Sequence, residues 1–249
     1  MNTLLKRCAR GAFNAIGLDV GRRCAPHPAN EGSTADLRRA RIIQNAGVSL
    51  LLDVGANEGQ YALAVRAAGY SGRIASFEPL SDAFQILSST AASKPPWAVW
   101  NVALGPADST AELHVAGNSM SSSFLPMSNR HRELFPESLY VGSRNVPIRK
   151  LDSMRAELFL EHDRVYCKLD VQGFESSVLQ GATDSIASVV AIEVEICLAK
   201  LYEGQTAAGE MISKLDSLGF DLVSLDNGDI DQDSGHVLWC DGIFQRRGC

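Results

Sequence analysis

Two short segments of the chain have the residue types and the spacing to bind a nucleoside. The first is DVGANEG at residues 53–59, which directly follows an apolar run. Gly55 and Gly59 allow the backbone to turn and to approach a ligand closely. The second is Glu78, whose carboxylate can accept hydrogen bonds from both hydroxyls of a ribose. In this order and at this spacing, the two segments predict a nucleoside-type site.

The glycine spacing narrows the class of nucleoside. A dinucleotide site has the pattern G-x-G-x-x-G, but Asn57 stands where the middle glycine belongs. A ligand without a pyrophosphate, such as S-adenosylmethionine, has less need of that glycine, and Asp53 can bind its ammonium directly or through water. The alternatives are an NAD(P)-dependent oxidoreductase and a non-catalytic nucleoside-binding domain of the same fold.

A third segment, KLDVQGFE at residues 168–175, places charged residues where another strand would end. At that position Asp170 would lie beside the methyl group of a bound S-adenosylmethionine. Gly173 allows the turn into the next helix. For Lys168 and Glu175, the alternative to a role in the chemistry is a structural ion pair.

The elements that must position these segments alternate between strand and helix. Two closing strands without a helix between them predict an antiparallel hairpin. We therefore predict an α/β, Rossmann-like fold: a mostly parallel, seven-stranded sheet with helices on both faces. The predicted strands are 50–54, 73–77, 97–102, 165–171, 189–196, 220–225 and 237–244.

Other segments lie outside this pattern. Residues 1–35 are predicted to be a helical segment and a loop in front of the main domain, which spans residues 36–249. Residues 116–145 are rich in Ser, Gly, Asn and Pro, and long irregular stretches of this kind in compact domains are usually functional. We predict that this insertion covers the acceptor site; the alternative is an ordinary loop. The basic run at residues 38–41 is interpreted as a solvated helix face.

The chain resembles the FkbM-type methyltransferases in six segments that follow one another in the family's order. The resemblance covers residues 48–246 and implies a class I methyltransferase fold with S-adenosylmethionine as cofactor. It also implies O-methylation of a hydroxyl, often on a sugar of a glycolipid, glycan or other glycosylated natural product. The six segments are LLDVGANEGQYA, SFEP, NVALG, VPIRKLDS, YCKLDVQGFE and DGIFQR.

By the same resemblance, individual residues take roles at the site. Asn101, at the end of the third strand, lies near the adenine, and Asp170 is at the catalytic position. Gln172 stands where many relatives have Glu. The residues at cofactor-binding positions are Asp53, Gly55, Asn57, Gly59 and Glu78.

Methyl transfer to a hydroxyl needs a base that takes the proton as the new bond forms. Asp170 is the first candidate and Glu195 the second, and we place Lys168 in the same catalytic group; His131 is a further alternative. A divalent metal ion bound by Asp170 and Glu195 could instead lower the pKa of the hydroxyl, but nothing in the spacing requires it. No metal-binding residue is therefore assigned.

The composition disfavours several classes of function. A net charge of −6 argues against a nucleic-acid partner, and six cysteines without CxxC spacing favour a reducing, cytoplasmic compartment. No apolar run is long enough to span a bilayer. The basic and apolar residues of the first 20 positions allow a peripheral membrane contact, which would suit a glycolipid acceptor.

Overall fold

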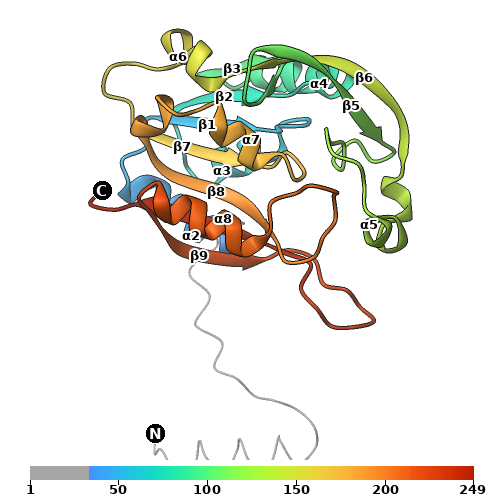
Figure 1. Ribbon diagram of the computed structural model, residues 1–249. Helices are drawn as coiled ribbons and strands as arrows, with labels where there is room; N and C mark the ends of the chain where they lie inside the picture. The colour runs from blue at the N-terminus through green and yellow to red at the C-terminus, as the bar shows by residue number, and fades with distance from the viewer. Residues whose placement is uncertain (1–33) are drawn as a thin grey trace, which may run out of the picture. The chain divides into compact units, whose positions relative to one another are not determined.

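The computed structural model describes residues 34–249, in which strands and helices alternate along the chain (Figure 1). Residues 1–33, which make up most of the predicted segment 1–35, lie outside the described residues, and so does the membrane contact predicted for that segment. No helix among the described residues is both long and apolar enough to cross a membrane.

Seven strands form the main sheet, in the order β3-β2-β1-β7-β8-β10-β9. Neighbouring strands are parallel except at β10, which is antiparallel to both β8 and β9. The predicted α/β fold, with a mostly parallel sheet and a closing antiparallel hairpin, is confirmed. The strands are β1 Leu50–Val54, β2 Arg73–Phe77, β3 Trp97–Trp100, β7 Val165–Leu169, β8 Val189–Cys197, β9 Phe220–Asn227 and β10 Trp239–Arg246.

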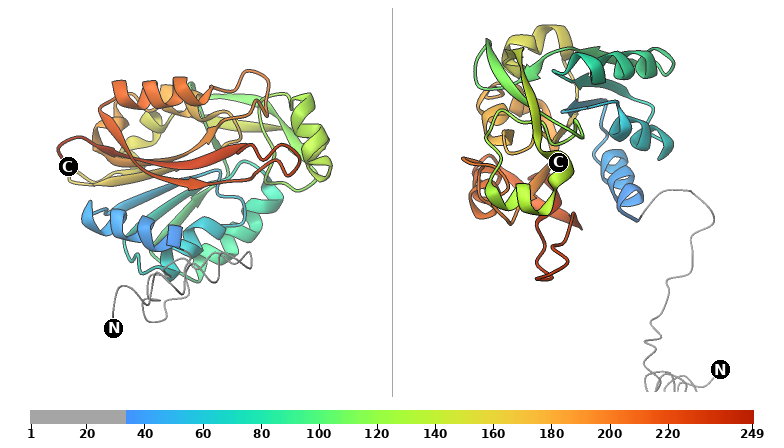
Figure 2. Two further views of the ribbon diagram at one scale, coloured as in Figure 1. Left: turned by 90° about the horizontal axis from the view of Figure 1, so that it is seen from below. Right: turned by 90° about the vertical axis from the view of Figure 1, so that its right-hand side faces the viewer.

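Helices cover both faces of this sheet (Figure 2). One face packs against α2 Thr34–Asn45, α3 Gln60–Ala67 and α4 Ser81–Ala92, and the other against α6 Leu151–Leu158, α7 Glu175–Gln180 and α8 Ala208–Ser217. The central strands can serve both layers because their apolar runs send successive side chains to opposite faces. Leu51 packs with the first layer and Leu52 with the second. Both are fully buried, and each contributes about 1.5–3 kcal/mol.

A smaller sheet of three strands, in the order β4-β6-β5, follows the first three strands of the main sheet. Part of this sheet and a short helix lie within residues 116–145, so the prediction that this whole stretch is irregular is wrong. Only Val146 and Ile148 of β6 are buried, so the exposed first half of that strand lacks the apolar alternation that would reveal it. The elements are β4 Ala103–Leu104, β5 Ser109–Ala116, α5 Asn129–Leu134, the 3-10 turn η1 Pro136–Ser138 and β6 Tyr140–Arg149; a second 3-10 turn, η2, spans Ser185–Ser188.

The ends of β1 and β7 approach each other so closely that only glycine fits at position 55. Asp170 donates its backbone N–H to the carbonyl oxygen of Val54 at 3.1 Å. A Cβ atom on Gly55 would lie 1.9 Å from the carbonyl oxygen of Asp170. Gly55 also has φ +78°, in the left-handed region that favours glycine. The contact presses the glycine-containing loop against the segment that carries Asp170.

Replacing Gly55 by alanine tests this approach. We expect Gly55→Ala to lose more than about 4 kcal/mol of unfolding free energy, because the new methyl group collides with the backbone of Asp170, just after β7. Gly235 is the matched control, since its φ is +73° but nothing lies within 4 Å of an added Cβ. Gly235→Ala should lose only about 1 kcal/mol. Equal losses in urea denaturation would contradict the close contact of β1 and β7.

Candidate active site

The carboxyl ends of the parallel strands open onto a cavity of about 320 Å³. Ligands of open α/β sheets bind at this edge. The cavity is lined by the loop after β1, by the end of β2, by the segment after β7, by the carboxyl-terminal half of β8 and by the start of β10. The predicted site residues that line it are Gly55, Asn57, Glu78, Lys168, Asp170 and Glu195.

Glu78 is fixed by the loop that follows β1. Its Oε2 accepts the backbone N–H of Asn57 at 2.9 Å, and its Oε1 accepts that of Leu80 at 2.8 Å. Asn57 can aim its N–H there because its φ is +48°, and the N–H groups of Gly55 and Ala56 are bonded to the carbonyl oxygen of Phe77. Burial raises the pKa of the Glu78 carboxyl to about 7. Each oxygen keeps a free lone pair for a ligand hydroxyl.

A row of charges crosses the sheet at the floor of the cavity. Asp53, Lys168 and Glu193 are in register on β1, β7 and β8, so their side chains leave the same face of the sheet. The Lys168 Nζ lies 3.6 Å from Asp53 Oδ1 and 3.2 Å from Asp170 Oδ2. Burial alone would lower the pKa of Lys168, but these two carboxylates outweigh it and hold the pKa above its usual value. Lys168 is thus a buried cation shared by two acids.

Asp53 does not itself line the cavity. It is completely buried, and its Oδ2 accepts a hydrogen bond from the Ser76 hydroxyl at 3.1 Å. Burial raises the pKa of its carboxyl despite the nearby ammonium of Lys168. Asp53 contacts Lys168, which lines the cavity; its binding of a ligand ammonium, directly or through water, stays a prediction.

The alternative of a Lys168–Glu175 ion pair is wrong. Glu175 instead accepts the backbone N–H groups of Val171 and Gly173, at 3.1 and 3.0 Å, and so shapes the turn after β7. Burial raises the pKa of the Glu175 carboxyl to about 7. Sequence spacing suggested the pair, but the left-handed backbone at Gly173 folds the segment back on itself.

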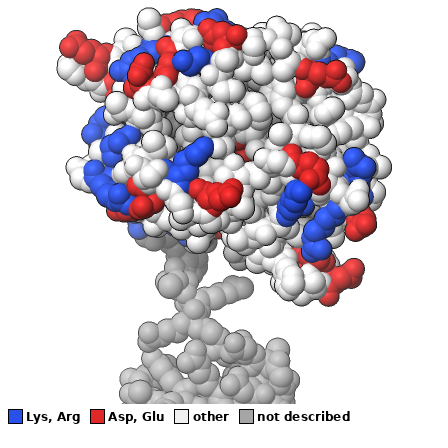
Figure 3. Space-filling view, viewed as in Figure 1, with Lys and Arg blue, Asp and Glu red and all other residues white. Residues whose placement is uncertain are grey.

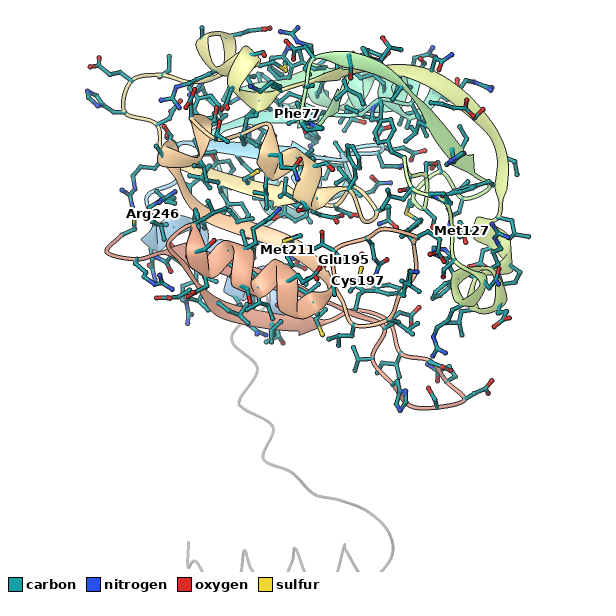
Figure 4. The ribbon with its side chains drawn as sticks, viewed as in Figure 1. Phe77, Met127, Glu195, Cys197, Met211 and Arg246 are labelled. Carbon is teal, nitrogen blue, oxygen red and sulfur yellow. The ribbon has the colours of Figure 1, made fainter. Side chains whose placement is uncertain are left out.

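Two acids face each other across β8 and β10. Glu195 and Asp241 are direct cross-strand neighbours, and both line the cavity. Burial, followed by the charges of Asp170 and Glu175, raises the pKa of Glu195 well above its usual value, and burial raises that of Asp241 to about 6. The thiol of Cys197 donates to Glu195 at 3.2 Å, and the two lie side by side in Figure 4. Burial therefore favours the protonated form of Glu195.

Sequence reasoning missed a buried polar cluster around Glu193, which lies two residues before Glu195 on β8. Glu193 accepts two hydrogen bonds from Arg39 Nε and one from its Nη2, at 2.7–3.0 Å. It also accepts from the hydroxyls of Tyr61 and Tyr166, at 2.5 and 2.6 Å. The interpretation of residues 38–41 as a solvated face is thus wrong for Arg39, whose side chain is only 12% exposed. A charged residue inside the apolar run of β8 was the available clue, because a buried carboxylate needs a partner.

Other predicted residues take supporting positions outside the cavity lining. The amide of Asn101 donates to the carbonyl oxygens of Glu78 and Pro79, at 2.9 and 3.1 Å, and so holds the end of β2. Gly59 precedes α3 with φ +93°, and a Cβ there would lie 2.9 Å from the Trp97 ring. His131 is buried, with its Nε2 2.8 Å from the hydroxyl of Ser138. None of the three contacts the cavity.

The stretch 116–145 contributes one wall of the cavity through Ser119, Met120, Ser122 and Phe124. Asn57 reaches across to it, donating its side-chain amide to the Ser119 hydroxyl at 3.0 Å. The other apolar residues predicted to touch an acceptor do not line the cavity; these are Leu125, Met127, Phe135 and Tyr140.

Charge elsewhere on the molecule is mixed. On the face shown in Figure 3, basic side chains are interspersed with acidic ones instead of gathering in one patch. Among residues 34–249, no group of three or more His, Cys, Asp or Glu side chains is placed to hold a metal ion.

Comparison with known proteins gives one match in sequence and several in structure. The model of a family described as the methyltransferase FkbM domain matches residues 53–222. No curated protein sequence matches the chain.

Three solved structures are similar to the chain, each with a TM-score of 0.48. The methyltransferase FkbM from Methylobacillus flagellatus KT is 12% identical, and the match covers 80% of this chain but 43% of that one. TehB from Haemophilus influenzae is 8% identical, with 86% and 62% covered. The magnesium protoporphyrin IX methyltransferase from Synechocystis PCC 6803 is 10% identical, with 97% and 96% covered. The chain thus spans less than half of the first structure.

The Arg39–Glu193 pair should be essential for stability. We expect Arg39→Met to lower the unfolding free energy by about 3–5 kcal/mol, because it leaves the Glu193 carboxylate buried without its cation. Arg38, the next residue of α2, is the matched control: it pairs with Asp226, but its side chain is 42% exposed. Arg38→Met should cost less than about 1 kcal/mol. Similar losses for the two variants, measured in urea, would refute this role of the pair.

Proposed function

The chain belongs to the FkbM methyltransferase family, and we propose that it methylates a hydroxyl group, most specifically a sugar hydroxyl of a glycolipid, glycan or other glycosylated product. S-adenosylmethionine is its methyl donor. When bound, this cofactor would supply an electrophilic methyl group on a sulfonium: the acceptor oxygen would bond to the methyl carbon in line as the methyl–sulfur bond breaks and S-adenosylhomocysteine leaves. The family match leaves the NAD(P)-dependent oxidoreductase without support.

The observation that carries the proposal is the Glu78 carboxylate, buried at the end of β2 and anchored to the loop after β1. Its two free lone pairs suit the two hydroxyls of the cofactor's ribose. Gly55 lies beside it without a side chain, so a ligand can approach the backbone there. The residues present therefore fit the nucleoside end of S-adenosylmethionine.

Asp170 is the proposed base. Its side chain is 41% exposed, lines the cavity, and follows the strand that touches the cofactor loop. Glu195 is less suited to take a proton, because burial raises its pKa and favours its protonated form. In that form Glu195 can donate a hydrogen bond to an acceptor oxygen. The Lys168 ammonium lies beside the proposed base, with its Nζ 3.2 Å from Asp170 Oδ2.

The remaining wall suits an uncharged sugar better than a phosphate or carboxylate. The basic residues that line the cavity are Arg39 and Lys168, and each is already engaged by buried or partly buried acids. The stretch 116–145 offers two hydroxyls, from Ser119 and Ser122, beside the apolar side chains of Met120 and Phe124. Hydroxyls beside an apolar surface complement the polar edge and the apolar face of a sugar ring.

Cofactor binding should depend on Glu78 and on pH. We expect S-adenosylhomocysteine to bind about tenfold more weakly for each pH unit below 7, because a protonated Glu78 loses acceptor capacity and binding selects the ionised form. Glu78→Gln should bind weakly at every pH. Glu58→Gln, an exposed change in the same loop, should leave binding intact. Calorimetric titration between pH 5 and 8 measures this; equal affinity in wild type and Glu78→Gln would overturn the assigned cofactor site.

Methyl transfer should depend on Asp170 much more than cofactor binding does. We expect Asp170→Asn to lower kcat by roughly 10²–10⁴-fold while the Kd for S-adenosylhomocysteine changes little. The assay uses labelled S-adenosylmethionine with a panel of alkyl glycosides and glycolipids, and mass spectrometry locates the methyl group. A product methylated at nitrogen or carbon would reject O-methylation, and full activity in Asp170→Asn would reject the base.

A further inference from the structure

The carboxylate of Asp170 is held on both sides. Lys168 Nζ lies 3.2 Å from Oδ2, and Gln172 donates its Nε2–H to Oδ1 at 2.7 Å. An ionised carboxylate only accepts hydrogen bonds, so the amide must turn its NH2 group toward Asp170 and its oxygen away. The hydrogen bond to the Asp170 carboxylate therefore fixes the orientation of the Gln172 amide.

Tyr202 holds the far end of that amide. Its hydroxyl lies 2.8 Å from Gln172 Oε1, which can only accept, so the hydroxyl donates. The one proton of this hydroxyl goes to Gln172, although the Ser121 carbonyl oxygen lies 3.1 Å away. The link of Tyr202 to the stretch 116–145 is its β-bridge with Met127. Tyr202 is fully buried, so its position is fixed by packing. It thus connects the wall formed by residues 116–145 to the carboxylate of Asp170.

The strained backbone at Gln172 indicates that this residue is kept for its side-chain amide. Its φ is +54°, a conformation that costs a residue other than glycine about 1–3 kcal/mol. In the described part of the chain, the other non-glycine residues with positive φ are Asn57 and Ser119, and all three line the cavity. Glycine would remove this cost at position 172 but could not hold Asp170.

We propose that Gln172 and Tyr202 are a positioning pair for Asp170. The pair orients the carboxylate toward the acceptor hydroxyl and makes that orientation depend on the wall from residues 116–145. This inference rests on the proposed function, in which Asp170 takes the proton of a hydroxyl. A neutral amide suits the task because its NH2 group donates to the carboxylate of Asp170.

The first test compares four variants in steady-state kinetics. Gln172→Gly relieves the backbone and removes the amide; we expect kcat to fall roughly 10–100-fold with little change in the KM for S-adenosylmethionine. Tyr202→Phe should lower kcat in the wild-type background but add nothing in the Gln172→Gly background, because its hydroxyl acts through the amide. Tyr70→Phe, which removes a hydroxyl bonded to Arg73 at the opposite end of β2, is the control.

Independent effects of Gln172→Gly and Tyr202→Phe that simply multiply would overturn the pair, as would unchanged kcat in either one. A loss confined to the KM for the cofactor would also overturn it, because a positioning role for Asp170 predicts a loss in kcat. Urea denaturation of each variant separates these outcomes from failure to fold.

The second test needs no acceptor, so it stands even where the proposed function fails. NMR follows the side-chain amide protons of Gln172, assigned by their absence in Gln172→Gly. We expect these protons to exchange slowly with solvent in wild type and to lose that protection in both Asp170→Ala, which removes the acceptor, and Tyr202→Phe. Unchanged exchange in these variants would overturn the pair. A wild-type enzyme that methylates no hydroxyl, with the exchange result as expected, would overturn the proposed function and leave the pair in place.

Discussion

The ammonium of Lys168, buried between the carboxylates of Asp53 and Asp170, is the interaction on which the site depends. A lone charge at this depth would cost several kcal/mol, and it is tolerated because acids lie on both sides. Their spacing follows from the parallel register of β1 and β7, which places Asp53 opposite Lys168. That register in turn requires the bare backbone of Gly55 against Asp170. Fold and chemistry therefore share one constraint.

The same register orders the cavity from one side to the other. Glu78, at the end of β2, lies at the proposed nucleoside end; Lys168 of β7 and Asp170 just after that strand form the proposed transfer centre; Glu195 and Asp241 on β8 and β10 lie farthest across the sheet. The Arg39–Glu193 pair closes this far side and brings α2, the first described helix, into the wall. The proposed roles thus follow the order of the strands, which lie only about 4.8 Å apart.

Among the described residues, the non-glycine residues with positive φ all line the cavity. Asn57 turns its N–H toward Glu78, Gln172 turns its amide between Asp170 and Tyr202, and Ser119 receives the side chain of Asn57. All three have positive φ without being glycine, and in each case a side-chain hydrogen bond accompanies the strain. The stretch that carries Ser119 is consequently tied both to the cofactor loop and to the segment after β7.

The sequence by itself determined the sheet, the loop after β1, Glu78 and the segment around Asp170, because apolar runs and strand-end glycines are local patterns. It could not reveal the partners of those residues. Arg39 and Glu193 are 154 positions apart, Asn57 and Ser119 are 62 apart, and Gln172 and Tyr202 are 30 apart. Their side chains meet only once the register of the sheet and the path of the stretch 116–145 are set. Strand identity is therefore encoded locally, whereas the hydrogen bonds that orient a carboxylate depend on long-range packing that no spacing along the chain records.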